Sequence, residues 1–136
     1  MCFPMERAVE KKWDYKGLQC IVTRADVHDP THYSAHRCGY VRVPPNHPWH
    51  GKNEGEIDVF VHGGLTFLQE EPCVHEDGIG YWIGFDCHHA GDAGLPAGDP
   101  REIKYPRFSM GYEHYWTLSE VQRETELLAE QVLQLS

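Results

Sequence analysis

The hydrophobic pattern of the chain is clearest in the block Glu56–Asp92, where two apolar segments each end in a group of Asp, His and Gly residues. The first segment, EIDVFVHGGLTF, alternates apolar and other positions from Ile57 to Val61. A period of two is typical of a β-strand with one buried face. This alternation places Asp58 and His62 together on the opposite face, where they are available for chemistry.

The second segment, IGYWIGFDCHHAGD, has the same period. It predicts a strand with Tyr81, Ile83 and Phe85 on one face. The other face holds Trp82, Gly84 and Asp86. Polar groups at the ends of rigid strands are where binding and catalytic residues concentrate, so we expect any functional site to lie in this block.

Three further strands are predicted upstream. Trp13–Tyr15 and Leu18–Thr23 are expected to meet at Lys16-Gly17, and Cys38–Val43 forms the third. Pro44-Pro45 ends that strand, because proline cannot donate a backbone hydrogen bond to a ladder.

The remaining stretches lack periodicity. We expect a helical turn or loop at Glu6–Lys12, and loops at Asp26–His36 and at Asn46–Gly55, where Trp49 is expected to be exposed. Ala93–Pro100 is also predicted to be irregular, and the aromatic-rich stretch Ile103–Tyr115 to hold one strand or an ordered loop.

The C-terminus predicts an amphipathic helix over Thr117–Leu135. Thr117 and Glu120 form a capping box, in which each side chain accepts a hydrogen bond from the other residue's backbone. An apolar stripe follows at helical spacing: Val121, Leu128, Val132 and Leu135. We therefore predict an α+β fold, an antiparallel sheet of about five strands with this helix on one face.

Composition narrows the classes of function. A chain of 136 residues is one domain, and its net charge of −9 argues against binding bulk nucleic acid. No apolar run is long enough to span a membrane, and the N-terminus lacks the apolar region of a secretory signal. The five scattered cysteines, which form no CxxC pair, indicate a reduced, cytoplasmic setting.

The runs CGYV, HPWHGK, EIDVFVHGGLTF and WIGFDCHHAGD, with the glutamate-rich C-terminal helix, carry a resemblance. The chain resembles a family of small uncharacterised phage- and prophage-associated proteins with HGGLT followed by GFDCxHxGD, over roughly Cys38–Asp92 and the helix. The resemblance implies an accessory protein in a bacterial host cytoplasm. Small phage proteins are often inhibitors of host immunity, and some sequester or cut cyclic-nucleotide signals, so the context suggests an anti-defence role.

The residues themselves indicate a pocket for a small anionic, nucleotide-like ligand. Gly63 and Gly64 permit close approach of a ligand to the backbone, and an indole can stack on a base. Arg42 and Lys52 are candidates for phosphate contacts. The full candidate set is Asp58, His62, Gly63, Gly64, Trp82, Asp86, His88, Asp92, Arg42 and Lys52.

Three alternatives use the same region or the helix. A metal-dependent hydrolase would bind zinc or manganese through His62, Asp86, His88 or Asp92, with His89 interchangeable with His88. A nucleophilic Cys87 is disfavoured because sequence neighbours such as His88 generally point away from it. The acidic helix could also serve a protein partner or a homo-oligomer. We favour sequestration of the ligand without turnover and without a cofactor, and the metal-dependent hydrolysis of a nucleotide-like substrate remains the alternative.

Overall fold

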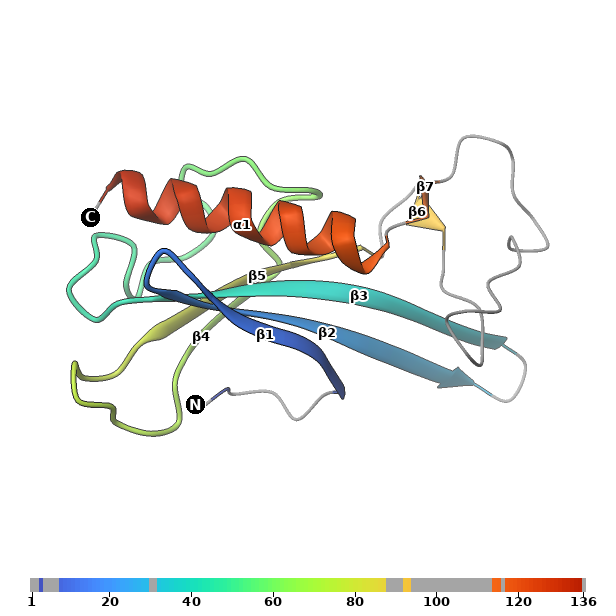
Figure 1. Cartoon of the computed structure of the whole chain (residues 1–136), viewed down its shortest axis with the longest axis horizontal. Helices are drawn as coiled ribbons and strands as arrows, with labels where there is room; N and C mark the ends of the chain where they lie inside the picture. Colours follow the sequence, from blue (N-terminus) through green and yellow to red (C-terminus); the bar gives the residue numbers. More distant parts are fainter. Residues whose placement is uncertain are drawn as a thin grey trace.

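The computed structural model describes residue 3 and residues 8–29, 32–87, 92–93, 114–115 and 117–135. Five antiparallel strands form one sheet with a helix across one face (Figure 1), so the predicted α+β fold is confirmed. The strands are β1 (Ala8–Tyr15), β2 (Leu18–Asp29), β3 (His32–Val43), β4 (Phe67–Glu70) and β5 (Tyr81–Asp86). Their order in the sheet is β1-β2-β3-β5-β4. The helix α1 spans Leu118–Gln134, and β6 (Asp92–Ala93) pairs in parallel with β7 (His114–Tyr115).

The β1–β2 hairpin turns at Lys16-Gly17, as predicted. Both residues have positive φ, 50° and 90°, which suits the right-handed twist of the flanking strands. The prediction of a strand at Cys38–Val43 that ends before Pro44 is also confirmed, although β3 starts earlier, at His32.

Two loop predictions upstream were wrong. Asp26–Asp29 and His32–His36 extend β2 and β3, where they pair residue by residue. Residues 8–12 of the stretch Glu6–Lys12 belong to the edge strand β1. In both cases the backbone ladder with the neighbouring strand of a hairpin satisfies the backbone groups, so no side-chain alternation is needed. The exposed Lys11 and Lys12 also suit an edge strand, because charge there discourages pairing with other chains.

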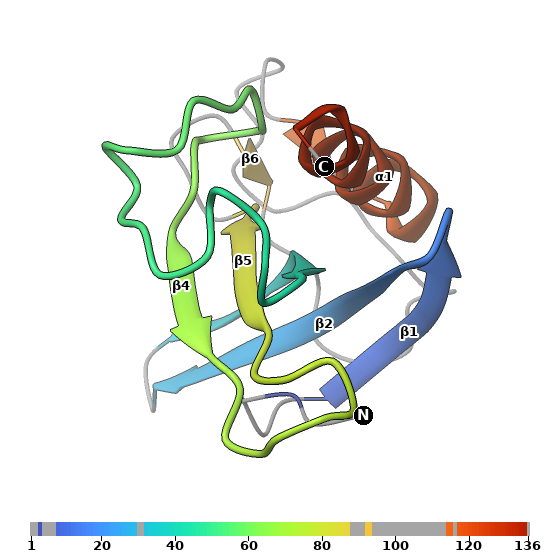
Figure 2. The same ribbon diagram turned by 90° about the vertical axis from the view of Figure 1, so that its left-hand side faces the viewer.

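The segment Ile57–His62 is not a strand, although its alternation was correctly predicted. Ile57 is buried and Val59 packs on the core, whereas the Phe60 side chain is 88% exposed. Two of its residues, Phe60 and His62, form backbone hydrogen bonds with side chains of α1. The Gln131 side chain accepts a hydrogen bond from the Phe60 N–H at 2.8 Å and donates one to the Phe60 carbonyl at 2.7 Å. The Glu124 carboxylate accepts from the His62 N–H at 2.8 Å. Figures 1 and 2 show this segment on the same side of the sheet as α1.

The other flank of α1 is held by β1. Three side-chain hydrogen bonds join β1 to α1, and they are spaced two residues apart on the strand and four residues apart on the helix. Two strand residues span about 6.6 Å and four helix residues about 6 Å, so the two spacings match. They are Lys11–Gln122 at 2.7 Å, Trp13–Glu126 at 3.1 Å and Tyr15–Glu130 at 2.8 Å. The polar side chains of α1 therefore fasten it to the segments on either side.

The helix itself agrees closely with its prediction. Thr117 and Glu120 form the expected capping box, and Val121, Leu128 and Val132 are fully buried. Leu135, the last position of the predicted stripe, was wrongly assigned to the core and is 50% exposed. The apolar stripe ends with the helix, because Leu135 is already its C-cap.

A glycine in β3 brings α1 close to the sheet. A Cβ atom at Gly39 would lie 2.2 Å from Thr125 Oγ1, so only glycine permits this contact. Trp49 is 5% exposed, which corrects the expectation that it is exposed. The His47 ring explains this burial, since it bonds to the Val132 carbonyl at 2.7 Å and accepts from Trp49 N–H at 3.0 Å.

The sheet separates two apolar clusters. The larger one lies between the sheet and α1, and the smaller one on the opposite face consists of Ile21, Cys38, Tyr40 and Trp82, with Phe3 and Phe67 packed against it. No helix in the described part of the chain is long and apolar enough to cross a membrane.

Candidate ligand site

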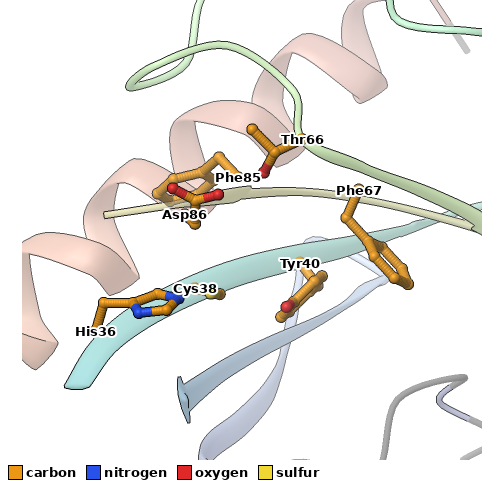
Figure 3. Close-up of a pocket in the computed structure, with 7 residues that line it drawn as sticks. All are labelled: His36, Cys38, Tyr40, Thr66, Phe67, Phe85 and Asp86. Carbon is orange, nitrogen blue, oxygen red and sulfur yellow. The ribbon is translucent and has the colours of Figure 1, made fainter. Parts of the chain in front are cut away.

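A cavity of about 120 Å³ lies beside the smaller cluster, where β4 begins. Figure 3 shows three of its residues in a row along β3, with others contributed by β5 and by the entry to β4. The lining residues are His36, Cys38, Tyr40, Thr66, Phe67, Phe85 and Asp86.

The strand register builds this cavity. Asp86 of β5 lies directly opposite Cys38 of β3, and His36 and Tyr40 lie two residues to either side of Cys38. Side chains at opposite and diagonal positions of an antiparallel pair are close enough to interact. The four side chains therefore line one surface, on the face away from α1.

The open side of the cavity follows from the shortness of β4. Phe67, the first residue of β4, pairs with Gly84, and Thr66 N–H donates to the Gly84 carbonyl at 2.9 Å. Phe85 and Asp86 therefore extend beyond the end of β4. A larger side chain at Gly84 would displace the Tyr40 ring, because a Cβ atom there would lie 2.4 Å from Tyr40 Cδ1.

The lining combines a carboxylate, an imidazole, two hydroxyl groups and aromatic rings. The rings of Tyr40 and Phe67 meet edge to face with centroids 5.2 Å apart. Asp86 is an acceptor when ionised, and the hydroxyls of Tyr40 and Thr66 can donate or accept. No lysine or arginine is among the lining residues. This arrangement suits a flat, hydrogen-bonding group.

Among the site residues predicted from sequence whose side chains are described, Asp86 alone lines the cavity. Gly63 and Gly64 lie just upstream of Thr66, and both have positive φ, 69° and 78°. Their turn directs the chain from the segment against α1 toward β4, and so positions Thr66 and Phe67.

The other described candidates lie elsewhere. Asp58 and Lys52 are exposed, and the Lys52 carbonyl accepts from the Tyr81 hydroxyl at 2.7 Å. His62 is half-buried near α1, where its backbone N–H meets Glu124. Trp82 is completely buried, and its Nε1 donates to Glu71 at 3.2 Å.

Arg42 is engaged in a buried ionic network. Its Nε donates to Glu71 at 2.9 Å, and its two terminal nitrogens reach both oxygens of Asp77 at 2.9 Å. The hydrogen bond to Asp77 raises the pKa of Arg42. This guanidinium joins β3 to the loop between β4 and β5, so its role in the structure is to hold that loop.

His88, His89 and the Asp92 side chain lie outside the described residues. Cys87 is buried and is not disulfide-bonded, and the same holds for Cys20 and Cys38. Burial raises the pKa of Cys20 to about 12, which keeps this thiol protonated. Cys73 is disulfide-bonded, which corrects the expectation from the scattered cysteines that all of them are reduced. Within the described side chains, no three His, Cys, Asp or Glu residues are grouped to hold a metal.

Sequence reasoning missed most of the cavity. His36, Cys38 and Tyr40 alternate in HRCGYV, and this period was the available signal. It was overlooked because His36 was assigned to a loop. Comparison with protein-family models, curated proteins and solved structures finds no match to this chain.

Proposed function

We propose that this protein binds and sequesters a small anionic, nucleotide-like ligand without converting it. The observation that carries the proposal is the cavity that combines the Asp86 carboxylate and the Thr66 hydroxyl with the rings of Tyr40 and Phe67. Stacking on aromatic rings and hydrogen bonding to a base or sugar are the usual means of nucleotide recognition.

The size of the cavity limits what enters it. Pockets that enclose a drug-sized ligand have volumes of roughly 300–1,000 Å³, whereas this one measures about 120 Å³. One ring of a nucleotide fits inside, and the remainder of the ligand stays outside the cavity.

Charge sets the orientation of the ligand. The Asp86 carboxylate accepts hydrogen bonds and does not attract a phosphate group, and no lysine or arginine is among the residues that line the cavity. The base or sugar therefore enters, and the phosphate points toward solvent and the surrounding surface.

The biological setting extends the proposal. In a phage-encoded protein of the bacterial cytoplasm, such binding would withdraw a nucleotide signal from host immunity. One molecule bound per site would suffice for this role, in a monomer or a homo-oligomer.

Calorimetry of the purified protein with a panel of nucleotides tests the proposal, together with chromatography of each nucleotide before and after incubation. We expect saturable binding with intact recovery of the ligand. Asp86→Asn should weaken binding about ten- to a hundredfold, because it removes a charged hydrogen-bond acceptor. Asp14→Asn, the same change at an exposed position of β1, is the matched control. New products would favour the metal-dependent hydrolase, and absence of binding would refute the proposal.

A further inference from the structure

We propose that Phe60 and Leu127 form an interaction surface for a partner protein that is basic around an apolar pocket. Phe60 belongs to the segment beside α1, and Leu127 to α1 itself. The cavity described above lies on the opposite face of the sheet. The surface therefore serves a second function, which does not depend on the binding of a nucleotide.

The ring of Phe60 is held in solvent by its own backbone. Val59 and Val61, on either side of it, pack against the core, and the Phe60 side chain is 88% exposed. The Gln131 side chain bonds to both the N–H and the carbonyl of Phe60, at 2.8 and 2.7 Å. The backbone is thus fixed before any partner binds, so little further ordering is needed when a partner covers the ring.

Leu127 places a second apolar side chain near Phe60. It lies one helical turn before Gln131, whose side-chain nitrogen also donates to the Leu127 carbonyl at 3.2 Å. Residues four apart are neighbours on a helix surface, so Leu127 lies beside the residue that holds Phe60. Leu127 is 49% exposed. Aromatic side chains are enriched at the centres of protein interfaces, so we assign Phe60 as the anchor and Leu127 as its apolar neighbour.

The two elements that carry this pair are acidic. Besides Glu126 and Glu130, which bond to β1, residues 52–62 and α1 contain five acidic side chains and two basic ones, Lys52 and Arg123. Asp58, two residues before the anchor, is exposed. The five acidic residues are Glu54, Glu56, Asp58, Glu120 and Glu124.

This charge decides the kind of partner. A second copy of the chain would bring the same acidic residues together, and like charges across an interface oppose association. Nucleic acid and anionic membranes are repelled for the same reason. A protein whose basic side chains border an apolar pocket is complementary in both respects, since the pocket covers Phe60 and the bases face the carboxylates.

Fluorescence anisotropy with two labelled helical peptides tests the proposal. One peptide consists of leucine and lysine, so it has the apolar and basic character of the proposed partner, and in the other glutamate replaces every lysine. We expect the wild type to bind the basic peptide, more weakly as salt is added, and not to bind the acidic one. Phe60→Ala should weaken binding about tenfold or more, and Leu127→Ala about threefold.

Val74→Ala is the matched control, because Val74 is 73% exposed on the loop between β4 and β5, and this variant should bind as the wild type does. Equal affinity in wild type and Phe60→Ala, equal binding of the two peptides, or no binding of the basic peptide would each overturn the proposal. Sedimentation of the wild type alone should show no self-association that Phe60→Ala abolishes, since that result would assign the surface to a second copy. If Phe60→Ala melted early, Leu127→Ala would keep the test decisive.

Discussion

Glu71 is the first residue of the loop between β4 and β5, and its side chain is fully buried. Its Oε1 accepts from Gly80 N–H at 2.6 Å and from Arg42 Nε at 2.9 Å, and its Oε2 accepts from Trp82 Nε1. Such a carboxylate is costly to bury, and removing it leaves its donors without an acceptor. Glu71 therefore links Arg42 of β3 and Trp82 of β5 to the loop between β4 and β5.

Glu71→Ala should destabilise the protein by about 3–5 kcal/mol, the range for breaking a buried ion pair. Urea unfolding measures this change. Glu70→Ala is the matched control, since Glu70 is the adjacent residue and is exposed. A loss in Glu71→Ala no larger than that in Glu70→Ala would contradict the role given to the network.

The same network predicts a dependence of stability on pH. The hydrogen bonds from Arg42 lower the pKa of Asp77 below its ordinary value of 3.8. Since the folded pKa is the lower one, the stabilisation is complete above 3.8 and disappears as the pH falls through the folded value. The effect is modest, because the Asp77 side chain is 49% exposed.

Melting temperatures measured from about pH 5 to pH 2 should therefore fall more steeply for the wild type than for Asp77→Asn. The asparagine variant cannot lose this charge, so its curve lacks this contribution. Parallel curves for the two proteins would show that Asp77 does not couple folding to pH.

Gly64 offers a test of backbone conformation alone. Its φ is +78° and a Cβ atom would meet nothing within 4 Å, so a side chain there is strained without a clash. Gly64→Ala should cost about 1–2 kcal/mol in unfolding free energy. Gly55→Ala, at an exposed glycine without positive φ, should cost less. Equal costs would mean that the turn adapts to a side chain.

At the scale of elements, α1 acts as the support for the sheet. Val132 and Leu128 are fully buried in the core, whereas Leu135 is 50% exposed. Leu128→Asp or Val132→Asp should unfold the protein or make it insoluble, because each buries an unpaired charge. Leu135→Asp should fold normally. Thermal melting with circular dichroism compares the three, and near-parental melting of both core variants would contradict the packing of α1.

Local signals allowed some elements to be predicted and not others. The capping box at Thr117 and the alternation around Ile83 each depend only on a few consecutive residues, so both could be predicted. The hairpin that pairs Val27 with Ser34 is also local, but the stretch has no apolar alternation to mark its two strands. Ile57–His62 has the alternation of a strand but is not one. Its alternation reflects burial on one side, and the Gln131 side chain of α1 hydrogen-bonds to its backbone at Phe60.

The candidate site was only partly predictable for the same reason. Asp86 was identified because it ends an apolar strand, yet its neighbours in the cavity come from β3 and from the start of β4. The register that sets Asp86 opposite Cys38 is a tertiary feature. His62 and Asp58 shared a predicted face, but that face belongs to a segment beside α1.

On the scale of the whole molecule, the two faces of the sheet have different roles. One face packs against α1 and supplies most of the buried apolar surface. The opposite face carries a small cluster, the Arg42–Glu71–Asp77 network near one end and the cavity near the other. The network anchors the loop that joins β4 to β5, and these are two of the strands that border the cavity.

The most direct test of the central claim is a titration of the isotope-labelled protein with the nucleotides of the calorimetric panel, followed through its backbone amide resonances. The account predicts that the largest shifts fall on residues around the cavity, among them Cys38, Phe67 and Asp86. Shifts confined to the segment around Asp58 and His62, or no shifts at millimolar ligand, would contradict it.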